Sequence, residues 1–264
     1  MLSGIAGSIL HKIRSMIYSD SCEPGTLLPS KIFPLDIPLA PDEKTGFRSC
    51  PIFSGRVGRG NFLSAHVSVL SHGVIPHPLH IHREEEILIL FTGELEVIIS
   101  KEGETIGSGR NHLEPGHLIF YPSHFPHTIQ SIGCDPANYL MFKWTATRHH
   151  LKIPLAFGTY ALAGNELMPT QISGFHPTVI FEGSTIVLQK IQCHVSVLAA
   201  GAGYQPHTDP YDVVIVVLDG EVETLGERVK PFGIIFYASG EPHGIYNPGE
   251  KTARYLVIEF HWQL

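Results

Sequence analysis

The stretch Ile87-Leu-Ile-Leu-Phe91-Thr-Gly93-Glu-Leu-Glu-Val97 combines a short apolar run, a turn glycine and a second run in which acidic and apolar residues alternate. Short apolar runs bounded by glycine are typical of β-strands joined by tight turns. The pattern recurs further along the chain, where Val213-Val-Ile-Val-Val-Leu218 is followed by Asp-Gly220-Glu-Val-Glu-Thr224. The two segments predict two similar β units in one chain.

Three further matches follow the same order along the chain. They are His66–Leu70 with His194–Leu198, Leu118–Tyr121 and His127 with Ile234–Tyr237 and His243, and Tyr139-Leu140 with Tyr255-Leu256. Matches that keep their order over such lengths indicate a duplicated structural unit. We therefore predict an N-terminal extension at residues 1–45, a first domain at 46–165 and a second domain at 166–264.

The predicted fold is all-β. The chain contains 26 glycines and 20 prolines, and no amphipathic helical segment of 10–15 residues separates the apolar runs. Many short strands without intervening helices favour a sandwich or barrel over a βαβ fold. Further strands are expected at Ser64–Leu70, Leu95–Ile99, Val179–Phe181 and Tyr255–Phe260.

Composition argues against several classes of partner. The net charge is −7 and no basic run is present, so nucleic acid is not an expected partner. No apolar stretch reaches the roughly 18 residues of a membrane helix. Lys12 and Arg14 follow the apolar N-terminal residues, the reverse of a secretory signal, and the four cysteines form no CxxC pair. We expect a cytoplasmic protein, monomeric or homodimeric, that acts on a small molecule.

The 17 histidines are the unusual feature of the composition. If His80 and His82 lie in a strand, their side chains point to the same face. Glu86, four residues after His82, points to that face as well. His127, in Pro122-Ser-His-Phe-Pro-His127, can join them from a neighbouring strand. Three imidazoles and one carboxylate suit one divalent transition metal ion (Fe, Mn, Ni, Zn or Co) and leave two positions of an octahedron open.

The spacing H-x-H-x3-E-x6-G over residues 80–93, followed by P-x4-H over residues 122–127, resembles the paired motifs of the cupin superfamily. Cupins are jelly-roll barrels, so the resemblance implies two tandem cupin barrels, a bicupin. It also implies that the four metal ligands are His80, His82, Glu86 and His127. The chain departs from the pattern at His124, where the family commonly has glycine.

The second repeat does not preserve this ligand set. Aligned on Gly220, His207 stands where His80 does, Asp209 where His82 does and Val213 where Glu86 does, while His243 matches His127. We expect a retired site without metal. The alternative is a weaker second site in which His207, Asp209 and His243 form a two-histidine, one-carboxylate triad.

A fold and a set of metal ligands do not by themselves define a reaction. No residue of the motifs is identified as a catalytic acid or base. The leading hypothesis is a metal-dependent dioxygenase acting on a small organic substrate in a pocket lined by Leu88, Phe120 and Phe125. A metal-dependent isomerase, lyase or hydrolase is the second hypothesis. The third is a small-molecule binding or sensing protein without turnover.

Overall fold

The computed structural model describes residues 27–100, 107, 109–146, 154–163, 166–168 and 170–262. Within them it contains twenty strands, one 3-10 turn, η1 (Gly58–Gly60), and no α-helix. The all-β prediction is confirmed. Residues 1–26 of the predicted extension lie outside the described part of the chain.

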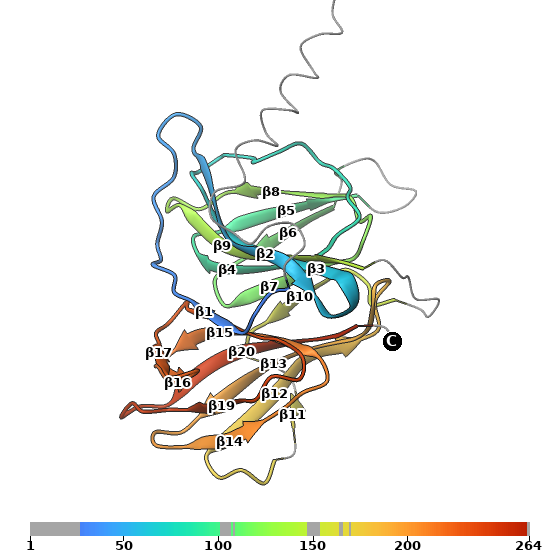
Figure 1. The fold of residues 1–264 in the computed structure, drawn as a ribbon. Coiled ribbons are helices and arrows are strands. Elements are labelled where there is room, and N and C mark those ends of the chain that lie inside the picture. Colours follow the sequence, from blue (N-terminus) through green and yellow to red (C-terminus); the bar gives the residue numbers. More distant parts are fainter. Residues whose placement is uncertain are drawn as a thin grey trace, which may run out of the picture.

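The first barrel is built from a six-stranded and a three-stranded sheet (Figure 1). The larger sheet has the order β10-β7-β4-β9-β3-β2 and the smaller one β6-β5-β8. The strands are β2 (Phe47–Val57), β3 (Asn61–Leu70), β4 (Glu85–Thr92), β5 (Leu95–Ile99), β6 (Gly109–Leu113), β7 (His117–Tyr121), β8 (His127–Ser131), β9 (Ala137–Thr145) and β10 (Gly158–Ala161).

The second barrel repeats this plan with a seven-stranded sheet, β1-β18-β15-β20-β13-β12-β11, and a four-stranded sheet, β14-β19-β16-β17. The strands are β1 (Lys31–Phe33), β11 (Glu166–Leu167), β12 (Phe175–Gly183), β13 (Leu188–Leu198), β14 (Gly203–His207), β15 (Asp212–Asp219), β16 (Val222–Thr224), β17 (Glu227–Val229), β18 (Ile234–Tyr237), β19 (His243–Tyr246) and β20 (Ala253–Trp262). β10 belongs to the first barrel and β11 to the second, while the division between residues 165 and 166 stays a prediction.

The two large sheets pack face to face, so each strand at their centre is buried on both sides. In β4, Ile87 and Ile89 belong to the core shared by the two barrels, whereas Leu88 and Leu90 face the interior of their own barrel. The central strand β15 alternates in the same way. Burial on both faces explains why these strands read as continuous apolar runs and not as an alternating pattern.

The turn glycines of the repeat are required by close backbone approach. Gly93 and Gly220 have φ of 75° and 70°, a region that favours glycine. A Cβ on Gly93 would lie 2.6 Å from the Cα of Ala137, and one on Gly220 would lie 2.7 Å from the carbonyl oxygen of Thr252. The glycine that marks each repeat therefore lets two strand ends pass each other.

The segment that precedes the first barrel also contacts the second. β1 pairs with β18, with Phe33 opposite Ile234. The backbone N–H of Leu39 then donates a hydrogen bond of 2.7 Å to Oδ1 of Asn138 in the first barrel. The segment thus extends the edge of one sheet and is attached to the other barrel. Within the described ranges, no helix combines the length and hydropathy needed to cross a bilayer.

Candidate metal centres

The four predicted ligands of the first barrel come from three places in the chain. Glu86 lies in β4, His127 opens β8, and His80 and His82 lie in the segment before β4. His80 and His127 form an isolated antiparallel bridge, with N–H···O distances of 3.2 and 3.1 Å in the two directions. The expectation that His80 and His82 share a regular strand is wrong: His80 makes a single bridge and His82 lies in irregular backbone.

The three imidazoles are oriented by backbone carbonyls. Nδ1 of His80 lies 3.1 Å from the carbonyl oxygen of His127, and Nδ1 of His82 lies 3.1 Å from that of Glu84. Nδ1 of His127 lies 2.8 Å from the carbonyl oxygen of Phe125. Because a carbonyl only accepts, each Nδ1 carries a proton, and in a neutral ring Nε2 then offers a lone pair. Potential ligand atoms of the three residues lie within 4.8 Å of one another.

The fourth predicted ligand, Glu86, is completely buried among these rings. Its Oε1 lies 3.0 Å from Nε2 of His82 and its Oε2 lies 3.2 Å from Nε2 of His127. Burial alone raises the pKa of Glu86, but the adjacent imidazoles of His127 and His82 and the charge of Lys143 outweigh it and hold the pKa well below its usual value. The carboxylate is therefore ionised although its own side chain is fully buried.

These donors fit a cation. With Nδ1 of His82 donating to a carbonyl, Nε2 and the Glu86 oxygen face each other lone pair to lone pair unless a proton or a cation lies between them. Without a cation, burial lowers the pKa of His82 but the hydrogen bond and charge of Glu86 outweigh it, so the pKa is raised. Burial and the neighbouring imidazoles lower the pKa of His80 to about 4, which keeps that ring neutral. Neutral imidazoles and an ionised carboxylate are the forms that bind divalent metals.

Lys143 is a site residue that sequence reasoning missed. It lies opposite Glu86 in the β4–β9 pair, and its ammonium contacts Glu86 Oε1. No local motif marks Lys143, because its place depends on the register of two strands more than 50 residues apart. An ammonium and a carboxylate thus stand side by side in the same cavity.

The cavity beside these groups has a volume of about 120 Å³. Tyr121 forms one wall and stacks on His127, with ring centroids 4.2 Å apart. The lining residues are Phe47, His66, Pro76, His77, Glu86, Leu88, Tyr121, His127, Thr128, Ile129, Tyr139, Met141 and Lys143. The cavity admits only a small molecule.

The predicted apolar lining was right in part. Leu88 lines the cavity, but Phe120 faces the other barrel, because strand alternation directs Tyr121 inward in its place. Phe125 lies outside the cavity wall and stacks on Phe157 with ring centroids 4.8 Å apart.

In the second barrel the structure brings together the three residues of the alternative second site. Potential ligand atoms of His207, Asp209 and His243 lie within 4.8 Å of one another. Oδ2 of Asp209 lies 3.5 Å from Nε2 of His207 and 3.3 Å from Nε2 of His243. Val213 stands opposite Tyr237 as Glu86 stands opposite Tyr121, so the alignment that places Val213 at the carboxylate position is correct. A cavity of about 190 Å³ adjoins the triad.

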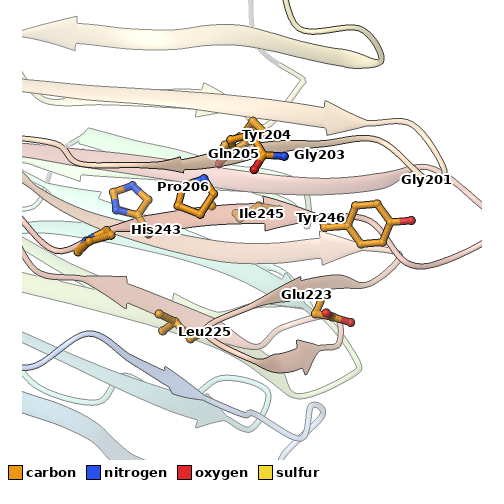
Figure 2. Close-up of a pocket in the computed structure, with 12 residues that line it drawn as sticks. Gly201, Gly203, Tyr204, Gln205, Pro206, Glu223, Leu225, His243, Ile245 and Tyr246 are labelled. Atoms are coloured by element: carbon orange, nitrogen blue, oxygen red, sulfur yellow. The ribbon is translucent and has the colours of Figure 1, made fainter.

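A wider groove of about 600 Å³ runs along β14, β16 and β19. Figure 2 shows His243 and Pro206 at one end of this groove and Tyr246 and Glu223 toward the other. His243 and Tyr204 line both the groove and the inner cavity of the second barrel. The described residues that line the groove form no cluster of metal-ligand side chains of their own, but the groove reaches the triad through His243.

Family models match both barrels. The model described as Cupin matches residues 63–164, and the model described as Cupin domain matches residues 194–259. Together these matches cover more than half of the chain, one in each barrel. The chain is a two-domain cupin. The expected tandem jelly-roll architecture is therefore confirmed.

Solved structures share the fold of this bicupin at low sequence identity. A mutant of oxalate decarboxylase OxdC from Bacillus subtilis is 16% identical, with a TM-score of 0.63 over 91% of this chain and 79% of that chain. A putative glyoxylate induced protein from Pseudomonas aeruginosa is 13% identical, with a TM-score of 0.70 over 93% and 96% of the two chains. AerE from Microcystis aeruginosa is 14% identical, with a TM-score of 0.58 over 81% and 99%. No curated protein matches the sequence significantly.

Proposed function

We propose that the N-terminal barrel is the active site of a metal-dependent enzyme that acts on a small organic anion. The observation that carries this proposal is the position of Lys143, whose ammonium shares a cavity of about 120 Å³ with Glu86 and His127. The metal would be held by His80, His82, Glu86 and His127, the residues whose geometry fits it.

The charges of the site favour an anion. The charges of Glu86 and Lys143 are opposite and equal, and imidazoles bind a metal in their neutral form, so a bound divalent cation would leave the cavity positive. A positive charge in a small cavity walled by protein attracts an anionic ligand more strongly than it would in water. The metal would supply a Lewis acid and open coordination positions.

Two side chains on the wall can orient such a substrate. The Lys143 ammonium donates to a carboxylate oxygen of the substrate when Glu86 is engaged by the metal. The hydroxyl of Tyr121 is buried and has no hydrogen-bond partner among the residues that the structure describes. Burial raises its pKa well above the usual value, so it stays a donor. Leu88 and Met141 form an apolar part of the wall.

Two reaction classes are consistent with this arrangement. The dioxygenase hypothesis rests on the ligand set and its open positions. The lyase hypothesis is supported by the fold shared with oxalate decarboxylase, an enzyme named for a small dianion. Oxalate is accordingly the first anion to test, followed by other small carboxylates.

The experiment measures both outcomes in one reaction. Metal-free protein is reconstituted separately with Mn²⁺, Fe²⁺, Ni²⁺, Zn²⁺ and Co²⁺ and incubated with each carboxylate. Oxygen uptake with substrate loss supports a dioxygenase, and carbon dioxide release without net oxygen uptake supports a decarboxylating lyase. Binding of the anions without turnover by any metal form would overturn the enzyme proposal in favour of a binding protein.

A further inference from the structure

The inner walls of the two barrels carry opposite charges at the same position. In the first barrel Lys143 of β9 stands opposite Glu86 of β4. At the corresponding strand pair of the second barrel, Glu259 of β20 stands opposite Val213 of β15. Glu259 lines the inner cavity of about 190 Å³, so an acid occupies the place that a base occupies in the other barrel.

A buried imidazole beside Glu259 has no hydrogen-bond partner. His194 of β13 lines the same cavity and is 7% exposed, and its Nδ1 makes no hydrogen bond within the described part of the chain. Burial lowers the pKa of His194 and outweighs the opposing charge of Glu259, so the ring is neutral. An unpaired buried polar atom is expensive unless a ligand or water completes it. The polar wall of this cavity is therefore incomplete without an occupant.

The spacing of these two groups fits one donor between them. Nδ1 of His194 lies 3.9 Å from Oε1 of Glu259, which is too long for a hydrogen bond. With the proton of the neutral ring on Nε2, both atoms are acceptors. An ammonium that donates to each of them over about 2.9 Å spans this distance, because its N–H bonds diverge. The two groups therefore offer a pair of acceptors to one positively charged nitrogen.

Asp209, the other carboxylate of the cavity, is engaged within the protein. Its Oδ2 lies 3.5 Å from Nε2 of His207 and 3.3 Å from Nε2 of His243. Burial raises the pKa of Tyr211, and the neighbouring carboxylates of Glu259 and Asp209 raise it further, so its hydroxyl stays protonated beside them. Glu259 is therefore the carboxylate that faces an unpaired atom.

Charge and apolar surface together define the class of ligand. No lysine or arginine occurs among the described residues that line the cavity. Phe175, Tyr204 and Tyr211 form part of the wall, and the ring centroids of the first two lie 5.4 Å apart. Carboxylates beside aromatic rings favour organic cations, because ring faces also attract positive charge. Ile215 and Val257 add apolar wall, which suits a ligand with a short apolar body.

We propose that the interior of the C-terminal barrel binds a small organic ammonium compound whose nitrogen bridges Glu259 and His194. The aromatic and aliphatic wall holds the apolar body of the ligand. The site is independent of the proposed function of the first barrel, where Lys143 at the equivalent position repels a cation. It needs no metal ion, since Glu259 and His194 belong to neither cluster of potential metal ligands among the described residues.

The test titrates three amines into full-length protein by isothermal titration calorimetry, with EDTA present to remove metal ions. The probes are ethylamine, isobutylamine and benzylamine, and each is compared with the alcohol of the same carbon skeleton. One amine per chain is expected to bind, roughly tenfold more tightly than its alcohol, because a charge-assisted hydrogen bond is about twice as strong as a neutral one.

Glu259→Gln removes the charge and keeps the size of the side chain. It should weaken binding of the amine by roughly tenfold and leave binding of the alcohol unchanged. Glu250→Gln, a change at an exposed acid of the same barrel, is the matched control and should bind the amine as wild type does. His194→Leu keeps an apolar side chain but removes one of the two acceptors, and should weaken amine binding by roughly fivefold.

The inference is overturned if none of the three amines binds, or if Glu259→Gln binds them as tightly as wild type. Equal affinity for an amine and its alcohol would overturn it as well. Far-ultraviolet circular dichroism and melting curves identify a variant that fails to fold, and His194→Leu then repeats the test on the second anchor. Failure of the proposed function leaves these results unchanged, because they are measured without metal and without an anionic substrate.

Discussion

Thr185 of the second barrel donates a hydrogen bond of 2.6 Å to Glu85 Oε2 of the first. Glu85 is fully buried and also accepts from Trp144 Nε1 at 2.8 Å and from the backbone N–H of Ile186 at 3.0 Å. Strand alternation turns Glu85 away from the interior of its own barrel, which Glu86 faces, and toward the second barrel. Asp212, the acid before Val213, occupies the same kind of position and accepts from Trp262 Nε1 at 2.6 Å.

Glu85→Ala should destabilise the protein by about 3 kcal/mol, because it leaves three buried donors without an acceptor at the barrel interface. The measurement is chemical unfolding followed by tryptophan fluorescence, which also reports on Trp144. Thr185→Val keeps the shape but removes the donor to Glu85 and the acceptor of the backbone N–H groups of Val187 and Leu188, so it should cost about 2 kcal/mol. Equal stability of Glu85→Ala and wild type would show that this contact does not hold the barrels together.

His80→Ala should weaken metal binding in the first barrel by about 100-fold or more. Loss of a residue that only hydrogen-bonds to a metal ligand already lowers metal affinity or activity by about 10–100-fold. The matched control is His77→Ala. The His77 ring lies 4.1 Å from that of His80, and its Nδ1 is bonded to the carbonyl oxygen of Pro78. Isothermal titration with Mn²⁺ in the Asp209→Asn background measures this site alone. An equal loss in both variants would contradict the assignment of His80 as a ligand.

Lys143→Met should raise the KM for an anionic substrate by about tenfold, because it removes a charge-assisted hydrogen bond of the kind worth 1.5–3 kcal/mol. Metal affinity should stay equal or increase, since the ammonium competes with the metal for Glu86. Lys143→Arg keeps the charge and should recover part of the KM. Loss of metal together with loss of activity in Lys143→Met would assign Lys143 a structural role.

His66 should make the metal-free protein sensitive to acid. Burial lowers the pKa of His66 from 6.5 to about 4, so the unfolded chain binds a proton in this interval that the folded one does not. The contribution of His66 to the free energy of unfolding is therefore fully present above pH 6.5. It decreases as the pH falls toward 4, by up to about 3 kcal/mol. Unfolding curves between pH 4 and 7 measure the effect. His66→Asn should show a flatter dependence, and an unchanged slope would exclude His66 as its source.

Local sequence was sufficient to locate the strands and the two barrels. Leu95–Ile99 is predicted and observed with the same bounds, and Ser64–Leu70 falls within β3. The two ligand clusters were also predictable, since His80, His82, Glu86 and His127 follow a spacing motif and His207, Asp209 and His243 follow from the internal alignment. These features depend on residues close in the sequence or on a repeat visible within it.

The sequence by itself determined the duplicated β architecture and the identities of the imidazole donors in each half. Only the tertiary structure decided which charges accompany those donors: Lys143 opposite Glu86 in one barrel, and Glu259 opposite Val213 in the other. The physical reason is that both partners lie on strands paired across long separations, where a shift of one residue would turn each side chain to the opposite face. The charge of the two cavities is therefore a property of strand register.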